Sequence, residues 1–189
     1  VHLFCCIGVD EDITNPALLY HFFDFYHPHG VDDFYIILQS NRNDRNRIDM
    51  ARNILKEYDI KERFTWTGEY CSPRLYDYML DAIKSMNNSG WMILTDIDEF
   101  HHFPGQAKTF LEDCDNRGVN CVQGRILDKV AANGELKPIT KDIPLDRQFP
   151  FSAPITKELA QGCIDKIAAL KQPLIPGKGH HHIIKKKWR

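Results

Sequence analysis

Two aspartates separated by one residue, Asp96 and Asp98, follow the apolar segment Trp91 to Leu94. Side chains two positions apart in an extended chain point the same way, so both carboxylates can face one ion. Carboxylate oxygens suit Mg²⁺ or Mn²⁺, and a diphosphate can complete the coordination shell. The pattern therefore predicts a site for Mn²⁺ or Mg²⁺. The simpler alternative is an acidic loop that caps the next helix and faces solvent.

Apolar strands and amphipathic helices alternate in the half of the chain before these aspartates. The sequence predicts strands at 1–7, 34–38, 64–67 and 91–95, with helices beginning near Asn15-Pro16, Asp44 and Ser72-Pro73. A less regular half follows, with a helix expected over 103–116 and a strand over 120–126. This alternation is typical of a parallel sheet covered by helices on both faces. Ligands of such sheets bind at the carboxyl ends of the strands, where the two aspartates are expected.

Composition describes an ordinary globular chain. Its 189 residues fit one domain, 1–189, and 43% of them are hydrophobic. A net charge of -2 gives no general attraction to phosphate, which argues against nucleic acid as a partner. No apolar run reaches the roughly 18 residues of a membrane span, so we expect no transmembrane segment. Because the chain begins at Val1 within a strand-like run, we expect a domain cut from a longer protein.

Six scattered cysteines form no CxxC pair, which argues against a structural zinc site. Several lie in apolar runs, where a thiol behaves as a small core residue. The sequence favours a soluble domain and leaves its compartment open, with a leaning towards a reducing one such as the cytoplasm.

The sequence resembles the GT-A-fold glycosyltransferases, especially those of the glycosyltransferase 2 and 92 type. Asp96-Ile97-Asp98-Glu99-Phe100 is similar to their DxD metal motif in its longer D-x-D-E-F form. The resemblance extends to 20–36, to Gly124 through Asp128, to Lys166, and to Gly179-His180-His181-His182. The last segment resembles the part in which many GT-A enzymes place a histidine metal ligand.

The resemblance implies a GT-A fold, which is a Rossmann-like α/β/α sandwich with a mainly parallel central sheet. It also implies a metal-dependent enzyme that uses Mn²⁺ or Mg²⁺. Such an enzyme transfers a hexosyl or deoxyhexosyl group from a nucleotide-diphosphate sugar to a hydroxyl of a glycan or other acceptor. A UDP-sugar is the favoured donor, and inversion is the expected stereochemistry.

Site roles follow from the same resemblance. Asp98 should bind the ion directly, and Asp96 should reach the ribose or the water shell of the ion. Arg74 and Lys166 should meet the diphosphate as positive charges. The nucleoside pocket should be shaped by two segments, Ile7, Gly8, Val9 and Asp10 after the first strand, and Gln39 to Asp44 after the second.

Histidine and aspartate alternatives stay open. His180 is the first choice for the third metal ligand, and His182 is its substitute because both would share a face of an extended segment. His101 could line the pocket, although a place in the loop is the simpler expectation. Asp128 is the candidate base that takes the proton of the acceptor hydroxyl. Asp142 and Asp146 are reserves, and any of the three could be an ordinary surface aspartate.

Two other classes compete with the transferase. A haloacid-dehalogenase-like phosphatase would use Asp96 as nucleophile and Asp98 as acid/base, but its motif usually ends the first strand of the fold. A non-catalytic nucleotide-sugar-binding module is the third class. The basic run 185–189 reads as a solvated tail, with a membrane or polyanion contact or a lid over the donor as alternatives.

Overall fold

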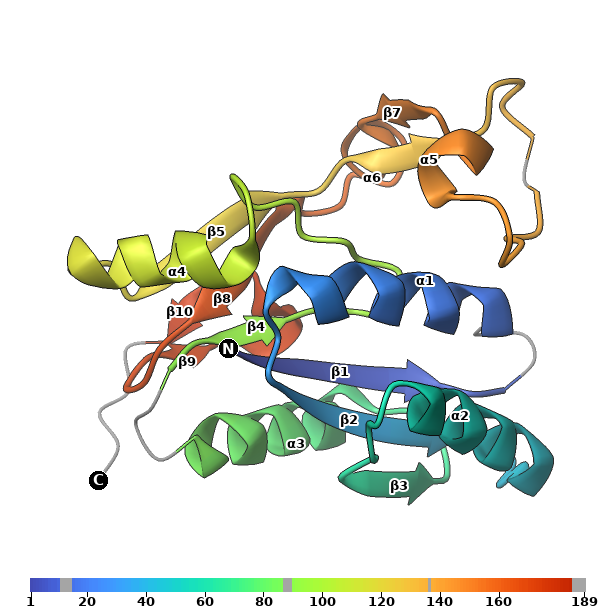
Figure 1. The fold of residues 1–189 in the computed structure, drawn as a ribbon, viewed down its shortest axis with the longest axis horizontal. Coiled ribbons are helices and arrows are strands. Elements are labelled where there is room, and N and C mark those ends of the chain that lie inside the picture. The colour runs from blue at the N-terminus through green and yellow to red at the C-terminus, as the bar shows by residue number, and fades with distance from the viewer. Residues whose placement is uncertain (11–14, 87–89, 136, 185–189) are drawn as a thin grey trace.

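A six-stranded sheet forms the centre of the computed structural model, which describes residues 1–10, 15–86, 90–135 and 137–184 (Figure 1). Its strand order is β3-β2-β1-β4-β8-β5. The first four are parallel: β1 His2–Gly8, β2 Asp33–Ser40, β3 Phe64–Thr67 and β4 Met92–Leu94. β8 Asp165–Leu170 runs antiparallel to both of its neighbours, β4 and β5 Cys121–Arg125. The carboxyl ends of the four parallel strands therefore share one edge of the sheet.

Four longer helices cover this sheet: α1 Pro16–Tyr26, α2 Arg45–Glu57, α3 Ser72–Ser85 and α4 Ala107–Asn116. Smaller elements follow in the second half: β6 Asp128–Val130, α5 Leu145–Gln148, β7 Phe151–Ala153, α6 Ile155–Glu158, β9 Ile175–Pro176 and β10 Ile183–Ile184. Two 3-10 turns are η1 His27–His29 and η2 Lys178–His180. β6 pairs with β7, and together with α5 and α6 they form a small lobe beyond the end of the sheet (Figure 1).

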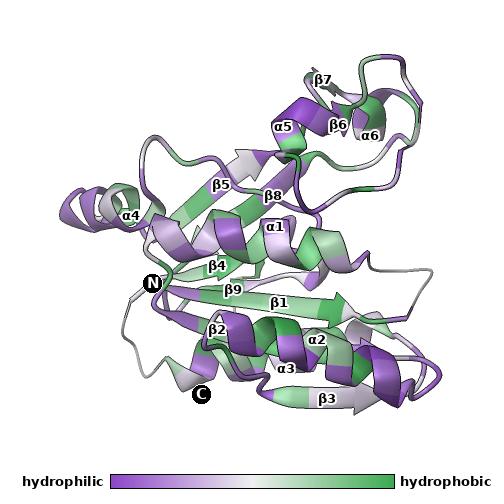
Figure 2. Ribbon diagram, turned by 45° about the vertical axis from the view of Figure 1, so that its right-hand side comes forward, coloured by the Kyte–Doolittle hydropathy of each residue, from purple (hydrophilic) through white to green (hydrophobic). Residues whose placement is uncertain are grey.

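The core has two apolar layers, one on each face of the sheet. Residues alternate between the faces along β1, so Leu3 and Ile7 pack with α1, α2 and α4, whereas Phe4 packs with α3. Hydrophobic residues concentrate on the central strands in Figure 2, as expected for a sheet buried on both sides. The predicted α/β architecture with a mainly parallel sheet between helices is confirmed. This arrangement is compatible with a Rossmann-like fold and is not specific to the GT-A form.

Local capping signals explain most of the element boundaries. Asn15 caps α1 as expected, because its side-chain oxygen accepts a hydrogen bond from the amide of Ala17 at 2.9 Å. The cap predicted at Ser72 is wrong. Cys71 holds the extended N-cap position, and Ser72 is already helical ahead of Pro73. In the second half, α4 begins at Ala107, four residues later than expected.

Two features of the chain bear on its surroundings. Within the described residues, no helix is long and apolar enough to cross a membrane. All six cysteines are free thiols, so none of them forms a disulfide bond. The expectations for the basic run 185–189 lie outside the described residues.

Candidate functional site

The acidic segment forms a closed turn at the carboxyl end of β4. The amide of Glu99 donates to the carbonyl of Asp96 at 3.0 Å, and the amide of Asp96 donates to Glu99 Oε2 at 3.2 Å. Thr95, the residue before the turn, donates its amide to the carbonyl of Phe4 on β1 at 3.2 Å. The turn therefore lies at the edge where the parallel strands end, as the sequence predicts.

Tyr26, the last residue of α1, holds this turn in place through hydrogen bonds of its side chain. Its buried hydroxyl donates to the carbonyl of Glu99 at 2.9 Å and accepts the amide of His101 at 3.0 Å. The hydroxyl of Thr95 also donates to the carbonyl of Glu99, at 3.0 Å. Burial is the main reason that the pKa of Tyr26 is raised, so the phenol stays protonated and keeps donating.

We expect Tyr26→Phe to lower the free energy of unfolding by about 1–3 kcal/mol, because the amide of His101 loses its partner and the carbonyl of Glu99 keeps only the bond from Thr95. Urea denaturation measures this difference. Tyr20→Phe is the matched control, since its hydroxyl bonds to Glu57 at the surface, and it should lose under about 0.5 kcal/mol. Equal stability of the two variants would mean that the hydroxyl of Tyr26 does not hold the turn.

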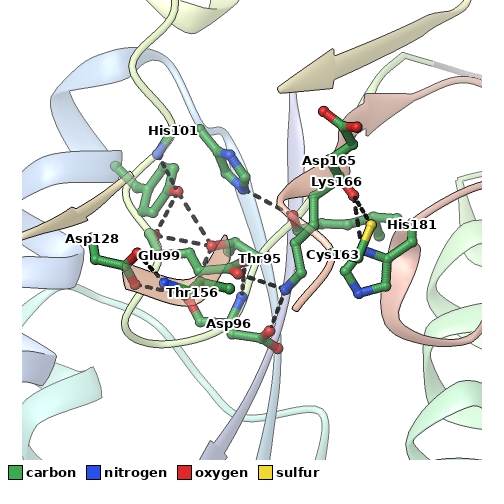
Figure 3. Close-up of polar contacts among 12 residues, drawn as sticks. Thr95, Asp96, Glu99, His101, Asp128, Thr156, Cys163, Asp165, Lys166 and His181 are labelled. Carbon is green, nitrogen blue, oxygen red and sulfur yellow. Dashed lines mark hydrogen bonds and ion pairs between the residues drawn. The ribbon is translucent and has the colours of Figure 1, made fainter. Parts of the chain in front are cut away.

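Lys166 reaches the turn from β8, the antiparallel neighbour of β4. Its ammonium lies 2.6 Å from Asp96 Oδ2 and 2.5 Å from Glu99 Oε1 (Figure 3). Burial by itself disfavours the charged forms of both Lys166 and Asp96. The two carboxylates nevertheless raise the pKa of Lys166, and Lys166 lowers the pKa of Asp96. Lys166 and Asp96 are therefore charged together at neutral pH. Lys166, Asp96 and Glu99 are called the ion triad below.

Asp98 differs from Asp96 in its environment. It is exposed, and the salt bridges of Lys166 run to Asp96 and Glu99. Partial desolvation, followed by the charge of Asp96, raises the pKa of Asp98. An added cation would relieve this repulsion between acids, so Asp98 is the carboxylate best placed to receive one.

His180 is the buried histidine of the triple-histidine segment. It is 4% exposed, and η2 packs against β8 and α3. Its Nδ1 has no hydrogen-bond partner among the residues that the structure describes. Burial lowers the pKa of His180 to about 4, with Asp96 acting in the opposite direction. The ring is therefore neutral at pH 7, which is the form that binds metals.

The prediction that His180 and His182 share a face is wrong. It assumed an extended segment, whereas Gly179 and His180 both have positive φ, of 71° and 54°. The chain turns there, and His182 is exposed. Its ring lies against Gly177, whose amide donates to the His182 carbonyl at 2.7 Å. His180 is thus the histidine that lies near the triad.

His101 supports the site from inside the protein. Its Nε2 donates to the carbonyl of Leu94 at 3.0 Å. Burial lowers the pKa of His101 to about 4, so the ring is neutral. With this bond and the one to Tyr26, His101 holds the end of β4 in place.

The residues expected around a nucleoside form hydrogen bonds that connect the ends of β1, β2 and β3. Asp10 is buried and accepts the hydroxyl of Ser40 and the amide of Asn41, both at 2.7 Å. Gln39 donates to Asn41 Oδ1 at 2.9 Å and to the carbonyl of Gly68 at 2.8 Å. The loops after β1, β2 and β3 are therefore tied into one rim. The remaining residues lie as follows: Ile7 and Val9 are in the core, Gly8 is half-buried at the end of β1, and Asp44 caps α2.

Arg74 lies on an aromatic surface at the start of α3. Its guanidinium carbon is 5.1 Å from the ring centre of Trp66 and 5.9 Å from that of Tyr78. Trp66 stacks on Tyr70 at 5.7 Å. Burial and then the charge of Asp96 raise the pKa of Tyr70, so this phenol lies within electrostatic reach of the triad. Of this group, the sequence had singled out Arg74 alone.

Asp128 belongs to the small lobe. Its two carboxylate oxygens accept the amide of Thr156 at 2.8 Å and the hydroxyl of Thr156 at 2.7 Å (Figure 3). Burial opposes its charge, but these bonds prevail and lower the pKa of Asp128, so it is ionised at neutral pH. Of the reserve acids, Asp146 pairs with Lys129 at 2.7 Å and Asp142 is exposed.

The donor types at the end of β4 fit a divalent cation. Asp96 and Asp98 supply two carboxylates, and the buried neutral imidazole of His180 lies within electrostatic reach of Asp96. Among the described residues, Nδ1 of His180 has no hydrogen-bond partner. In the part of the chain that the structure describes, however, no group of three or more His, Cys, Asp or Glu side chains is arranged to hold a metal ion. The bond of Asp96 to Lys166 is one physical reason, because an ammonium already contacts that carboxylate.

No family model matches the chain, and no curated protein matches it significantly. Its function therefore has to be inferred from the chemistry at this edge of the sheet.

Proposed function

We propose that the chain is a metal-dependent glycosyltransferase. It would move a sugar from a nucleotide-diphosphate sugar, with a UDP-sugar favoured, to an acceptor hydroxyl. The supporting observation is the set of charged and metal-binding groups at the end of β4: exposed Asp98, paired Asp96 and Lys166, and buried neutral His180. Open parallel sheets bind their ligands at this edge.

Departure of the nucleoside diphosphate builds negative charge that the site has to stabilise. Asp98, Asp96 and His180 would hold a divalent cation, which supplies Lewis acidity to the leaving group when bound. Lys166 would add a second positive charge for the phosphates at the same place, because its ammonium lies 2.6 Å from Asp96. Arg74 is a second candidate for the phosphates from the start of α3.

Asp128 is the proposed base for the acceptor hydroxyl, which corresponds to an inverting reaction. Thr156 orients its carboxylate, and each oxygen keeps a second lone pair for a proton. The lowered pKa keeps Asp128 in the ionised form that a base requires.

His180→Ala should weaken Mn²⁺ binding to the UDP-saturated protein by at least about tenfold, because it removes a neutral imidazole beside the acids. His182→Ala is the matched control from the same segment, and its exposed ring should leave Mn²⁺ affinity unchanged. Mn²⁺ titration followed by electron paramagnetic resonance measures both values. A larger loss in the His182 variant would transfer the ligand role to that residue.

A thermal-shift panel of nucleotide sugars, each with and without Mn²⁺, tests the proposed class. We expect one donor to raise the melting temperature in a Mn²⁺-dependent way, and that donor to be hydrolysed slowly without acceptor. Turnover of a generic aryl phosphate would instead favour the phosphatase. Mn²⁺-dependent binding without any turnover would favour the binding module.

A further inference from the structure

The ion triad already contains a cation that belongs to the protein. Lys166 comes from β8, 70 residues beyond Asp96, and its side chain is 10% exposed. Its ammonium lies within hydrogen-bond distance of one oxygen of Asp96 and one of Glu99. Two of the three acids in the D-x-D-E turn are therefore neutralised by an internal positive charge.

This charge opposes the binding of a divalent cation at the same carboxylates. A lysine ammonium has three donors and no lone pair, so it cannot share a metal and can only repel one. A metal ion that contacts Asp96 directly would have to separate Asp96 from Lys166. Asp98 lies outside these salt bridges and is exposed, so it offers one carboxylate without this competition.

A diphosphate removes this competition for Asp96, because it is an anion that attracts both the Lys166 ammonium and the divalent cation. With a diphosphate present, the ammonium has a new partner, and Asp96 becomes available to the ion. Binding of the two ligands is then coupled, and by linkage each increases the affinity for the other.

We propose that Lys166 is an internal counter-ion that keeps the end of β4 from binding a divalent cation until a nucleoside diphosphate is present. This inference rests on the proposed function and deepens it, since it assigns an order of preference to the ligands of the same site. Lys166 is a positioning residue in this scheme, and its removal should make the empty site a better metal site.

The test is Mn²⁺ binding without nucleotide, measured by titration calorimetry and electron paramagnetic resonance. Lys166→Met keeps the aliphatic stem and removes the charge. We expect it to bind Mn²⁺ at least about tenfold more tightly than the unaltered chain, equivalent to about 1.4 kcal/mol. The increase in Mn²⁺ affinity caused by saturating UDP should be correspondingly smaller in this variant.

Two controls separate the charge of Lys166 from unrelated effects. Lys166→Arg keeps a cation next to Asp96 and should retain the weak Mn²⁺ affinity of the unaltered chain. Lys171→Met removes a lysine just beyond the same strand, which pairs with Asp115 at 2.6 Å, and should also change nothing. If Lys166→Met unfolds without metal, Mn²⁺ should raise its melting temperature by more than it raises that of the unaltered chain.

Equal or weaker Mn²⁺ binding by Lys166→Met would overturn the inference. If the unaltered chain binds Mn²⁺ and UDP together in that case, the proposed function survives and only the role of Lys166 is lost. If neither protein binds Mn²⁺, with or without UDP, the metal-dependent function falls together with the inference.

Discussion

Asp98→Ala should lower Mn²⁺-dependent sugar transfer by about a thousandfold or more, equivalent to about 4 kcal/mol of transition-state stabilisation. Asp98 is the exposed acid of the turn, and the charge of Asp96 raises its pKa further beyond the effect of desolvation. Its loss removes the carboxylate best placed for the ion. Initial rates with the donor that gives the largest Mn²⁺-dependent thermal shift measure the effect.

The fold should tolerate this change, because an exposed side chain contributes little to the core. Asp113→Ala is a suitable control. It removes an exposed aspartate on α4, whose partner is Arg117 one turn away, and should leave transfer unchanged. Full activity of Asp98→Ala would contradict a metal-binding role for the turn.

Asp128→Asn should lower transfer by about a hundred- to ten-thousandfold, the usual contribution of a general base. The amide cannot take a proton from the acceptor hydroxyl. Its one oxygen can still accept the hydrogen bond from the amide of Thr156, and its NH2 group can donate to the Thr156 hydroxyl. Donor binding should therefore remain, and UDP affinity in the presence of Mn²⁺ is the measurement that shows it.

Thr156→Val separates a base from a merely structural acid. It removes the hydroxyl that Asp128 Oδ1 accepts and keeps the amide that Oδ2 accepts. If Asp128 acts as the base, Thr156→Val should retain most of the transfer rate. Similar losses in both variants would indicate that Asp128 only ties β6 to α6, and the base would have to be sought elsewhere.

Local signals made the first half of the fold predictable. β1, β2 and β4 contain apolar runs, and α1 begins at an Asn-Pro pair whose Asn side chain makes the expected cap. The place of Asp96 and Asp98 at a strand end follows from the same reasoning, because it depends on chain order alone. The exact caps depend on backbone conformation, so the Ser72-Pro73 pair alone does not reveal that Cys71 is the N-cap of α3.

Contacts between distant segments could not be predicted. Nothing near Asp96 in sequence indicates that Lys166 on β8 will neutralise it, or that Tyr26 on α1 will hold the carbonyl of Glu99. The hydrogen bonds of Asp128 also depend on a partner 28 residues away.

The sign of the backbone angle φ is a second property that the sequence did not reveal. The histidine segment reads as extended, but positive φ at Gly179 and His180 turns it and separates the two candidate ligands. Glycine before a histidine was the one available hint, since glycine adopts positive φ easily.

Calorimetric titration of UDP, with Mn²⁺ and again after its removal by chelation, tests most directly whether a cation at the end of β4 holds the diphosphate. We expect UDP affinity to fall at least about tenfold without Mn²⁺, whereas uridine, which has no phosphate, should bind equally in both conditions. UDP binding of the same strength with and without Mn²⁺ would contradict a metal-held diphosphate at Asp96 and Asp98.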